Sequence, residues 1–265
     1  MNRIGDAFRA ARKADRAAFI PYVTAGDPSL EDTVRLARAL RRAGADILEL
    51  GVPFSDPIAD GPTNQRAAER ALAAGATLAG VLDTVREIRS EVDLPIVLFS
   101  YSNPVMRYGV DRFAEDAAAA GVDGVLFTDV PVEEIAHVEP DLKRCGLRPI
   151  LLVTPTSTRE RIKTAARYGK GFLYLVSRTG VTGAQDHLDP DLAANIDTVR
   201  KASKLPVAVG FGISTPGQVA RVAALADGVV VGSAIVDRVA RLGGSPGLED
   251  AIQRFVTPLA EACRR

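Results

Sequence analysis

Short apolar segments alternate with amphipathic segments along the whole chain. Eight apolar segments have the length of strands and are dominated by Val, Ile and Leu without polar alternation: 19–24, 46–52, 95–101, 124–130, 149–154, 171–176, 206–211 and 228–233. Continuous apolar runs of this kind are typical of parallel strands that are covered on both faces. The pattern therefore predicts eight buried parallel strands.

The segments between these strands have the pattern of helices. Residues 29–44 begin with Ser29, a good N-cap, and end at Gly44, where a helix can stop. Thr215 precedes Pro216 in the same way, because proline is favoured at the first position of a helix. We expect a helix after each of these two caps.

Two further helices are predicted beyond a simple strand–helix alternation. Ile4, Phe8 and Ala11 recur at helical spacing, which predicts an additional helix at the N-terminus. Two helical stretches, 62–74 and 77–91, lie between the second and third strands. One extra helix is therefore expected after the second strand.

Eight strictly alternating strand–helix units without a linker favour one closed barrel. We predict that residues 1–265 form a single (β/α)8 TIM-barrel domain with the two extra helices. The pattern alone leaves an open, doubly wound sheet possible as an alternative.

Composition narrows the function classes. The chain has 33 basic and 33 acidic residues, so its charge gives no indication of a nucleic acid or an anionic membrane as a partner. No apolar run reaches the roughly 18 residues of a membrane span. The two cysteines, Cys145 and Cys263, and the two histidines, His137 and His187, show no spacing typical of a metal site or a disulfide framework. We expect a cytoplasmic protein with a small-molecule substrate and no metal.

Glu49 is a carboxylic acid inside an apolar strand. It stands between Leu48 and Leu50, and alternation along the strand places it on one face with Ile47 and Gly51. A buried carboxylate is costly unless it is paired or neutralised, and burial raises its pKa toward neutrality. The residues alone leave two interpretations open, a proton-transfer group and a structural ion-pair partner.

Asp60 lies in the proline-rich loop that follows this strand, at residues 53–62. The loop is long enough to act as a lid and to bring a second carboxylate over the barrel mouth. Two carboxylates at one site can divide acid and base roles. A solvated aspartate in a turn explains most Asp-Gly pairs equally well, so this indication is weak on its own.

Glycines recur at the ends of the last three predicted strands, in the segments 177–185, 210–214 and 232–236. Glycine lets backbone N–H groups approach a phosphate, and Ser233 is expected to begin a helix whose N-terminus favours an anion. Phosphate sites after strands seven and eight are frequent in this fold. Ordinary turns explain any one of these glycines, but three together favour a phosphate site.

The residues alone thus predict a barrel enzyme that handles a phosphorylated small molecule by acid–base chemistry. The run LELGVPFSDPIADGPTNQ, together with PYVTAGDP, YLVSRTGVTGA, GFGIS and GSAIV, resembles the tryptophan synthase α-subunit family over nearly the whole chain. The resemblance implies a carbon–carbon lyase that cleaves indole-3-glycerol phosphate to indole and glyceraldehyde 3-phosphate, in the last stages of L-tryptophan biosynthesis.

The resemblance also implies roles for individual residues. Glu49 and Asp60 match the essential carboxylates of the family. The positions that match its substrate-binding residues are Tyr22, Asn64, Tyr174, Thr182 and Phe211. Those that match its phosphate-binding residues are Gly183, Gly212, Gly232 and Ser233.

The implied reaction is a retro-aldol cleavage. C3 of the indole must gain a proton, the adjacent hydroxyl must lose one, and positive charge on the indole nitrogen must be balanced. We expect Glu49 to shuttle protons, Asp60 to stabilise the indole N–H and the lid at residues 53–62 to exclude water.

Four positions depart from the family pattern. Asn64 stands where an apolar residue, usually isoleucine, is expected, and Tyr22 replaces a common phenylalanine. The segment TDVP, at 128–131, replaces the more usual PDLP. Both carboxylates remain in place, so these differences concern substrate affinity more than the class of reaction.

The family works as an αββα heterotetramer with a β subunit that carries pyridoxal phosphate, so no cofactor is expected in this chain. The positions that match partner-facing residues are Asp56, Pro57, Asn103 and Pro131. The sequence shows no obvious exposed apolar patch, so the resemblance alone implies this partner.

Three alternatives remain. A free-standing indole-glycerol phosphate lyase would use the same chemistry without a partner. Another phosphate-binding barrel, such as an isomerase or epimerase, is disfavoured by Glu49 and Asp60 together with the loop 53–62. A non-enzymatic activator subunit is disfavoured by the same two carboxylates.

Overall fold

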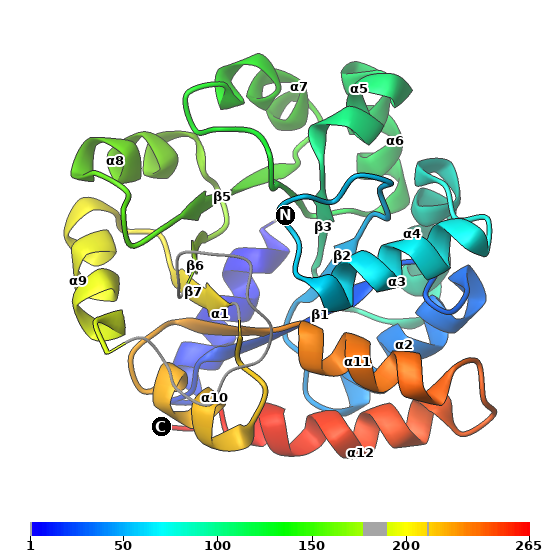
Figure 1. The fold of residues 1–265 in the computed structure, drawn as a ribbon. Helices are drawn as coiled ribbons and strands as arrows, with labels where there is room; N and C mark the ends of the chain where they lie inside the picture. Colours follow the sequence, from blue (N-terminus) through cyan, green and yellow to red (C-terminus); the bar gives the residue numbers. More distant parts are fainter. Residues whose placement is uncertain (1, 177–189, 211) are drawn as a thin grey trace.

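Eight parallel strands form a closed barrel in chain order, β1 to β8, with β8 paired to β1 (Figure 1). The computed structural model describes residues 2–176, 190–210 and 212–265. The strands are β1 (Ala18–Thr24), β2 (Leu48–Gly51), β3 (Ile96–Ser100), β4 (Gly124–Phe127), β5 (Arg148–Val153), β6 (Leu173–Val176), β7 (Val207–Gly210) and β8 (Gly228–Val231). All eight lie within or overlap the predicted segments. The predicted TIM barrel is confirmed, and the open sheet is excluded.

Helices surround this barrel (Figure 1). They are α1 (Arg3–Lys13), α2 (Leu30–Arg42), α3 (Pro62–Ala73), α4 (Leu78–Glu91), α5 (Ser102–Tyr108), α6 (Val110–Ala120), the 3-10 helix η1 (Ile135–His137), α7 (Glu139–Arg144), α8 (Arg159–Tyr168), α9 (Leu192–Ala202), α10 (Pro216–Ala223), α11 (Ser233–Leu242) and α12 (Leu248–Glu261). Both predicted additions are confirmed, because α1 precedes the first strand and both α3 and α4 lie between β2 and β3.

The predicted helix caps are also confirmed. The Ser29 side chain accepts a hydrogen bond from the backbone N–H of Asp32 at 3.0 Å, at the start of α2. Thr215 forms a reciprocal capping box with Gln218, and Pro216 is the first residue of α10. Each cap satisfies backbone donors that the first turn of a helix leaves unpaired, and such a cap contributes about 1 kcal/mol.

Two apolar cores hold the barrel together. The larger one lies between the strands and the surrounding helices. The smaller one fills the inside of the barrel with residues such as Ile20, Ile47 and Ile150. Helix α1 inserts Phe8 into this inner core, where its ring lies 5.4 Å from that of Phe172. Because α1 closes the amino-terminal end of the barrel, space for a ligand remains at the carboxyl end of the strands.

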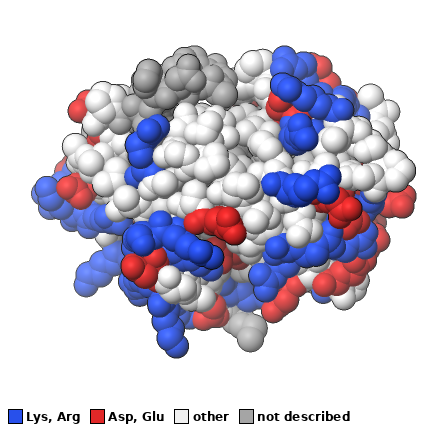
Figure 2. Space-filling view, turned by 90° about the horizontal axis from the view of Figure 1, so that it is seen from below, with Lys and Arg blue, Asp and Glu red and all other residues white. Residues whose placement is uncertain are grey.

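The surface carries charges of both signs. Figure 2 shows basic and acidic side chains interspersed over one side of the molecule, as the equal numbers of the two predict. Arg38 and Arg42 of α2, for example, both form ion pairs with Glu249 of α12. Within the described part of the chain, no helix is long and apolar enough to cross a membrane, and no cluster of three or more potential metal ligands occurs.

Candidate active site

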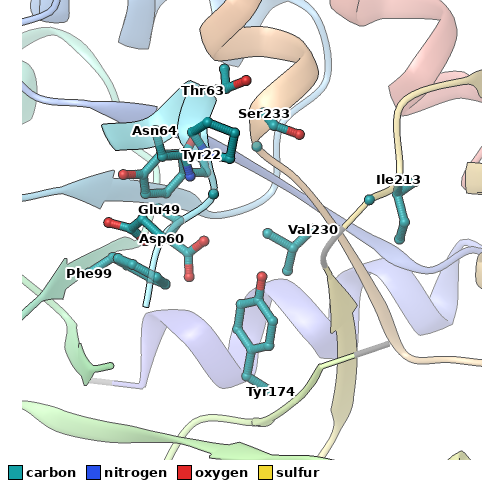
Figure 3. Close-up of a pocket in the computed structure, with 14 residues that line it drawn as sticks. Tyr22, Glu49, Asp60, Thr63, Asn64, Phe99, Tyr174, Ile213, Val230 and Ser233 are labelled. Carbon is teal, nitrogen blue, oxygen red and sulfur yellow. The ribbon is translucent and has the colours of Figure 1, made fainter. Parts of the chain in front are cut away.

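Most of the predicted site residues that the structure describes meet in one pocket at the carboxyl end of the barrel (Figure 3). Adjacent strands supply Tyr22 from β1 and Glu49 from β2, which are paired directly in the sheet register. The lining residues in the described ranges are Tyr22, Glu49, Asp60, Gly61, Pro62, Thr63, Asn64, Phe99, Tyr174, Gly212, Ile213, Val230, Gly232 and Ser233. Thr182, Gly183 and Phe211 lie outside the described residues.

Glu49 is buried at the bottom of this pocket. Glu49 is 1% exposed, and its Oε1 has no hydrogen-bond partner among the described residues. No ion pair links it to any described Lys, Arg or His, so the structural ion-pair interpretation finds no support in this part of the chain. Burial, together with the nearby charge of Asp60, raises the pKa of Glu49 from 4.5 to about 8. Glu49 is therefore protonated at neutral pH and can act as an acid.

Asp60 lies in the loop between β2 and α3 and is 8% exposed. Burial raises the pKa of Asp60 from 3.8 to about 6, and a hydrogen bond with Tyr101 opposes this rise. Asp60 is thus mostly ionised at neutral pH, where Glu49 is mostly protonated. Two neighbouring carboxyl groups with separated pKa values can divide acid and electrostatic roles.

Tyr101 is a site residue that the sequence pattern did not reveal. It follows β3 and is 3% exposed, and its hydroxyl accepts a hydrogen bond from the backbone N–H of Ala59 at 3.0 Å. The same hydroxyl is hydrogen-bonded to Asp60. Its ring packs against Phe54, with 5.2 Å between the ring centres. Tyr101 therefore holds both the loop 53–60 and the carboxylate at its end, although the sequence showed only the end of an apolar run.

Aromatic rings form the walls of the pocket. The rings of Tyr22 and Phe99 meet edge to face with centres 5.3 Å apart. Glycines make room for the tyrosine hydroxyls, because a Cβ at Gly51 would lie 2.2 Å from the Tyr22 oxygen, and one at Gly210 would lie 2.1 Å from the Tyr174 oxygen. These two glycines set the pocket shape. The sequence pattern gave no role to Gly51 and placed Gly210 in a segment expected to contribute to a phosphate site. Flat apolar walls suit an aromatic ring.

The other end of the pocket has the features of an anion site. Ser233 begins the ten-residue helix α11, as predicted. The N-cap residue is Gly232, so no N-cap side chain occupies the backbone N–H groups of the first turn. Gly212 has a φ of +78°, a conformation that favours glycine. The backbone N–H groups at the start of α11 and its dipole favour a phosphate group here.

The four predicted partner-facing residues lie outside the pocket, in the segments that follow β2, β3 and β4. Asp56, Asn103 and Pro131 are exposed, and Pro57 is partly exposed. The same segments expose two large apolar side chains that the sequence pattern did not reveal. Ile58 and Met106 are 82% and 67% exposed.

Comparisons with known proteins show which family this chain resembles. A sequence model of the family described as "Tryptophan synthase alpha chain" matches residues 8–263. The chain is 51% identical over 259 residues to a tryptophan synthase alpha chain from Solibacter usitatus, covering 98% of this chain and 97% of that protein. A second relative with the same name, from Geobacter sulfurreducens, is 51% identical over 262 residues, with 99% of each chain covered.

Solved structures agree with this. The crystal structure of tryptophan synthase subunit alpha from Legionella pneumophila matches with a TM-score of 0.91 and 39% identity, covering 99% of this chain and 98% of that chain. A chain of Mycobacterium tuberculosis tryptophan synthase matches with the same TM-score and 37% identity, covering 100% of this chain and 99% of that chain. The likeness extends over the whole barrel in both cases.

Proposed function

Because the chain belongs to the tryptophan synthase alpha chain family, it is a lyase that cleaves indole-3-glycerol phosphate in tryptophan biosynthesis, and we propose that Glu49 and Asp60 carry the chemistry. One observation supports this assignment above all. Two buried carboxyl groups with pKa values of about 8 and about 6 line one pocket, and the first residue of helix α11 lines the other end of the same pocket.

The substrate extends between these two ends. Its phosphate binds at Gly212, Gly232 and Ser233, together with Gly183, and its indole ring lies against the aromatic walls near the carboxyl groups. Tyr22, Asn64, Tyr174, Thr182 and Phe211 are the remaining substrate-binding residues of this proposal. The free cavity between the described residues is about 70 Å³, which is small beside the roughly 300–1,000 Å³ typical of ligand pockets. We expect substrate entry to widen it by movement of the loop 53–60.

Glu49 acts twice in the cleavage. The protonated acid first donates its proton to C3 of the indole, and positive charge develops on the ring nitrogen beside the Asp60 carboxylate. Glu49, now ionised, then removes the proton of the hydroxyl next to C3. The carbon–carbon bond breaks, its electron pair returns to the ring, and indole and glyceraldehyde 3-phosphate are released with Glu49 protonated again.

No cofactor of this chain takes part in these steps. The proposed partner is a β subunit, which would carry pyridoxal phosphate and join the chain in an αββα heterotetramer. A single domain over residues 1–265 and a cytoplasmic location belong to the same proposal.

Replacement of Tyr101 by Phe is expected to shift the acid limb of the pH profile. In the wild type, kcat/KM should fall below about pH 6 as Asp60 is protonated and above about pH 8 as Glu49 ionises. The Tyr101 hydrogen bond lowers the pKa of Asp60, so its loss raises that pKa and moves the acid limb to higher pH. At neutral pH, kcat/KM should fall several-fold. The measurement is kcat/KM from pH 5 to 9.

Tyr108→Phe is the matched control for this experiment. The Tyr108 hydroxyl donates a hydrogen bond to Asp116 of α6 at 2.7 Å, and neither residue lines the pocket. The control should keep the wild-type profile. An acid limb that stays in place in the Tyr101→Phe variant would show that this tyrosine does not tune Asp60.

The partner proposal predicts that a β subunit binds over Ile58 and Met106 and stimulates indole release. The purified chain should release free indole from indole-3-glycerol phosphate slowly, and faster after titration with a β subunit. Ile58→Ser or Met106→Ser should weaken this association roughly tenfold, because each loses apolar area that the complex would bury. Leu225→Ser, which is 36% exposed after α10, is the matched control. Equal turnover with and without a β subunit would instead indicate a free-standing lyase.

A further inference from the structure

Asn64 is counted among the substrate-binding residues, but the proposed mechanism names no substrate group that it binds. Asn64 Oδ1 is buried and has no hydrogen-bond partner among the described residues, a property that it shares only with Glu49 Oε1 in that part of the chain. An unpaired buried acceptor costs roughly 1–3 kcal/mol. The acid–base role of Glu49 accounts for its own carboxyl group. The Asn64 oxygen still requires a donor.

The position of Asn64 indicates where that donor would come from. Asn64 is the third residue of α3, which packs against β1 and α11. These elements supply Tyr22 and Ser233 to the same pocket, and Figure 3 shows Asn64 next to Tyr22, with the two carboxyl groups below this pair and Ser233 to its right. The Tyr22 hydroxyl pairs with Thr24 Oγ1 at 3.3 Å and does not donate to Asn64 Oδ1. A molecule that extends from the carboxyl groups to the start of α11 therefore occupies the pocket that the unpaired oxygen of Asn64 lines.

We infer that Asn64 accepts a hydrogen bond from the second hydroxyl of the glycerol chain and so determines specificity for a dihydroxylated substrate. This inference rests on the proposed function of the pocket. The first hydroxyl stands next to indole C3 and loses its proton in the cleavage. The second stands on the next carbon, beside the carbon that carries the phosphate. The inference thus assigns the reacting hydroxyl to Glu49, the second hydroxyl to Asn64 and the phosphate to the start of α11.

The reaction leaves the second hydroxyl intact, so Asn64 acts through binding. A substrate without this hydroxyl would leave the buried amide oxygen unpaired in the complex as well. An apolar side chain at position 64 could not make this distinction, because it offers no acceptor.

The test compares two substrates that differ only in this hydroxyl. Indole-3-glycerol phosphate is set against 3-hydroxy-3-(indol-3-yl)propyl phosphate, which keeps the reacting hydroxyl and yields indole and 3-oxopropyl phosphate. The wild type should prefer the natural substrate by roughly tenfold or more in kcat/KM. Asn64→Leu, of similar size, should reduce this preference to about twofold or less. Asn64→Ala, which adds no apolar bulk, should have the same effect if leucine is not tolerated.

Asn64→Asp separates an acceptor from a donor at this position. It keeps an acceptor oxygen, so the ratio of the two kcat/KM values should stay near the wild-type value, even though the added charge lowers both. A wild-type ratio in the Leu and Ala variants, or a lost ratio in the Asp variant, would overturn the assignment to Asn64 and leave the proposed function intact. A wild-type chain that released no indole from either substrate, with or without a β subunit, would overturn both.

Discussion

Replacement of Glu49 by Gln is expected to lower kcat for indole release by roughly a thousandfold or more. The amide keeps the size of the side chain, but it can neither donate a proton to indole C3 nor remove one from the hydroxyl, and general acid–base catalysis contributes about 10²–10⁴-fold for each role. Glyceraldehyde 3-phosphate should still bind, because the start of α11 is unchanged. Indole release and binding of this product are the two measurements.

Glu49→Asp gives a graded comparison for this variant. It retains an ionisable carboxyl group on a side chain shorter by one carbon, so it should keep more activity than Glu49→Gln. A Gln variant with turnover close to that of the wild type would assign the proton transfers to another group.

The Glu49→Gln variant should have a higher free energy of unfolding than the wild type at neutral and alkaline pH. The folded-state pKa of Glu49, about 8, lies above the ordinary value of 4.5, so the folded chain binds the proton more tightly than the unfolded chain does. Wild-type stability therefore falls as pH rises from about 4.5 to about 8, by about 1.4 kcal/mol for each unit of that shift as an upper limit. Glutamine has no proton to lose. Urea unfolding of the two proteins at pH 5 and pH 8.5 should show a difference that grows with pH.

The barrel and the acid within it could be predicted from the sequence because both follow from local patterns. Eight apolar segments specify eight buried strands, and alternation in β2 places Glu49 on the same face as Ile47, which lies in the inner core. A carboxyl group on that face can only point into the barrel. Ser233 was predictable for the same reason, since it follows an apolar strand and starts a helix.

Other site features depend on contacts between distant segments, which no local pattern contains. Tyr101 follows β3, yet it hydrogen-bonds to Ala59 across 42 positions of the chain. Gly51 and Gly210 resemble ordinary strand-end glycines. Glycine is required at these positions because the hydroxyls of Tyr22 and Tyr174 leave no room for a Cβ atom. The exposure of Ile58 likewise depends on how the loop packs. The residues around Ile58 and their hydropathy do not distinguish it from a buried isoleucine.

Replacement of Asp60 by Asn is expected to lower kcat/KM by roughly 10²–10³-fold, the usual effect of removing one preorganised electrostatic group. The neutral amide can still hydrogen-bond to Tyr101, so the loop 53–60 should stay in place, but it cannot balance positive charge on the indole nitrogen. The residual activity should lose the acid limb near pH 6. Its alkaline limb should move to lower pH, because the charge of Asp60 helps to raise the pKa of Glu49.

Asp129→Asn is the matched control for Asp60→Asn. Asp129 is exposed just beyond β4, at the same end of the barrel but outside the pocket, and its hydrogen-bond partner is Ser102. Removal of that charge should leave kcat/KM within about twofold of the wild type, since an exposed group interacts weakly through water. If both variants lost activity equally, the net charge at the barrel mouth would matter, and the specific contact of Asp60 with the substrate would not.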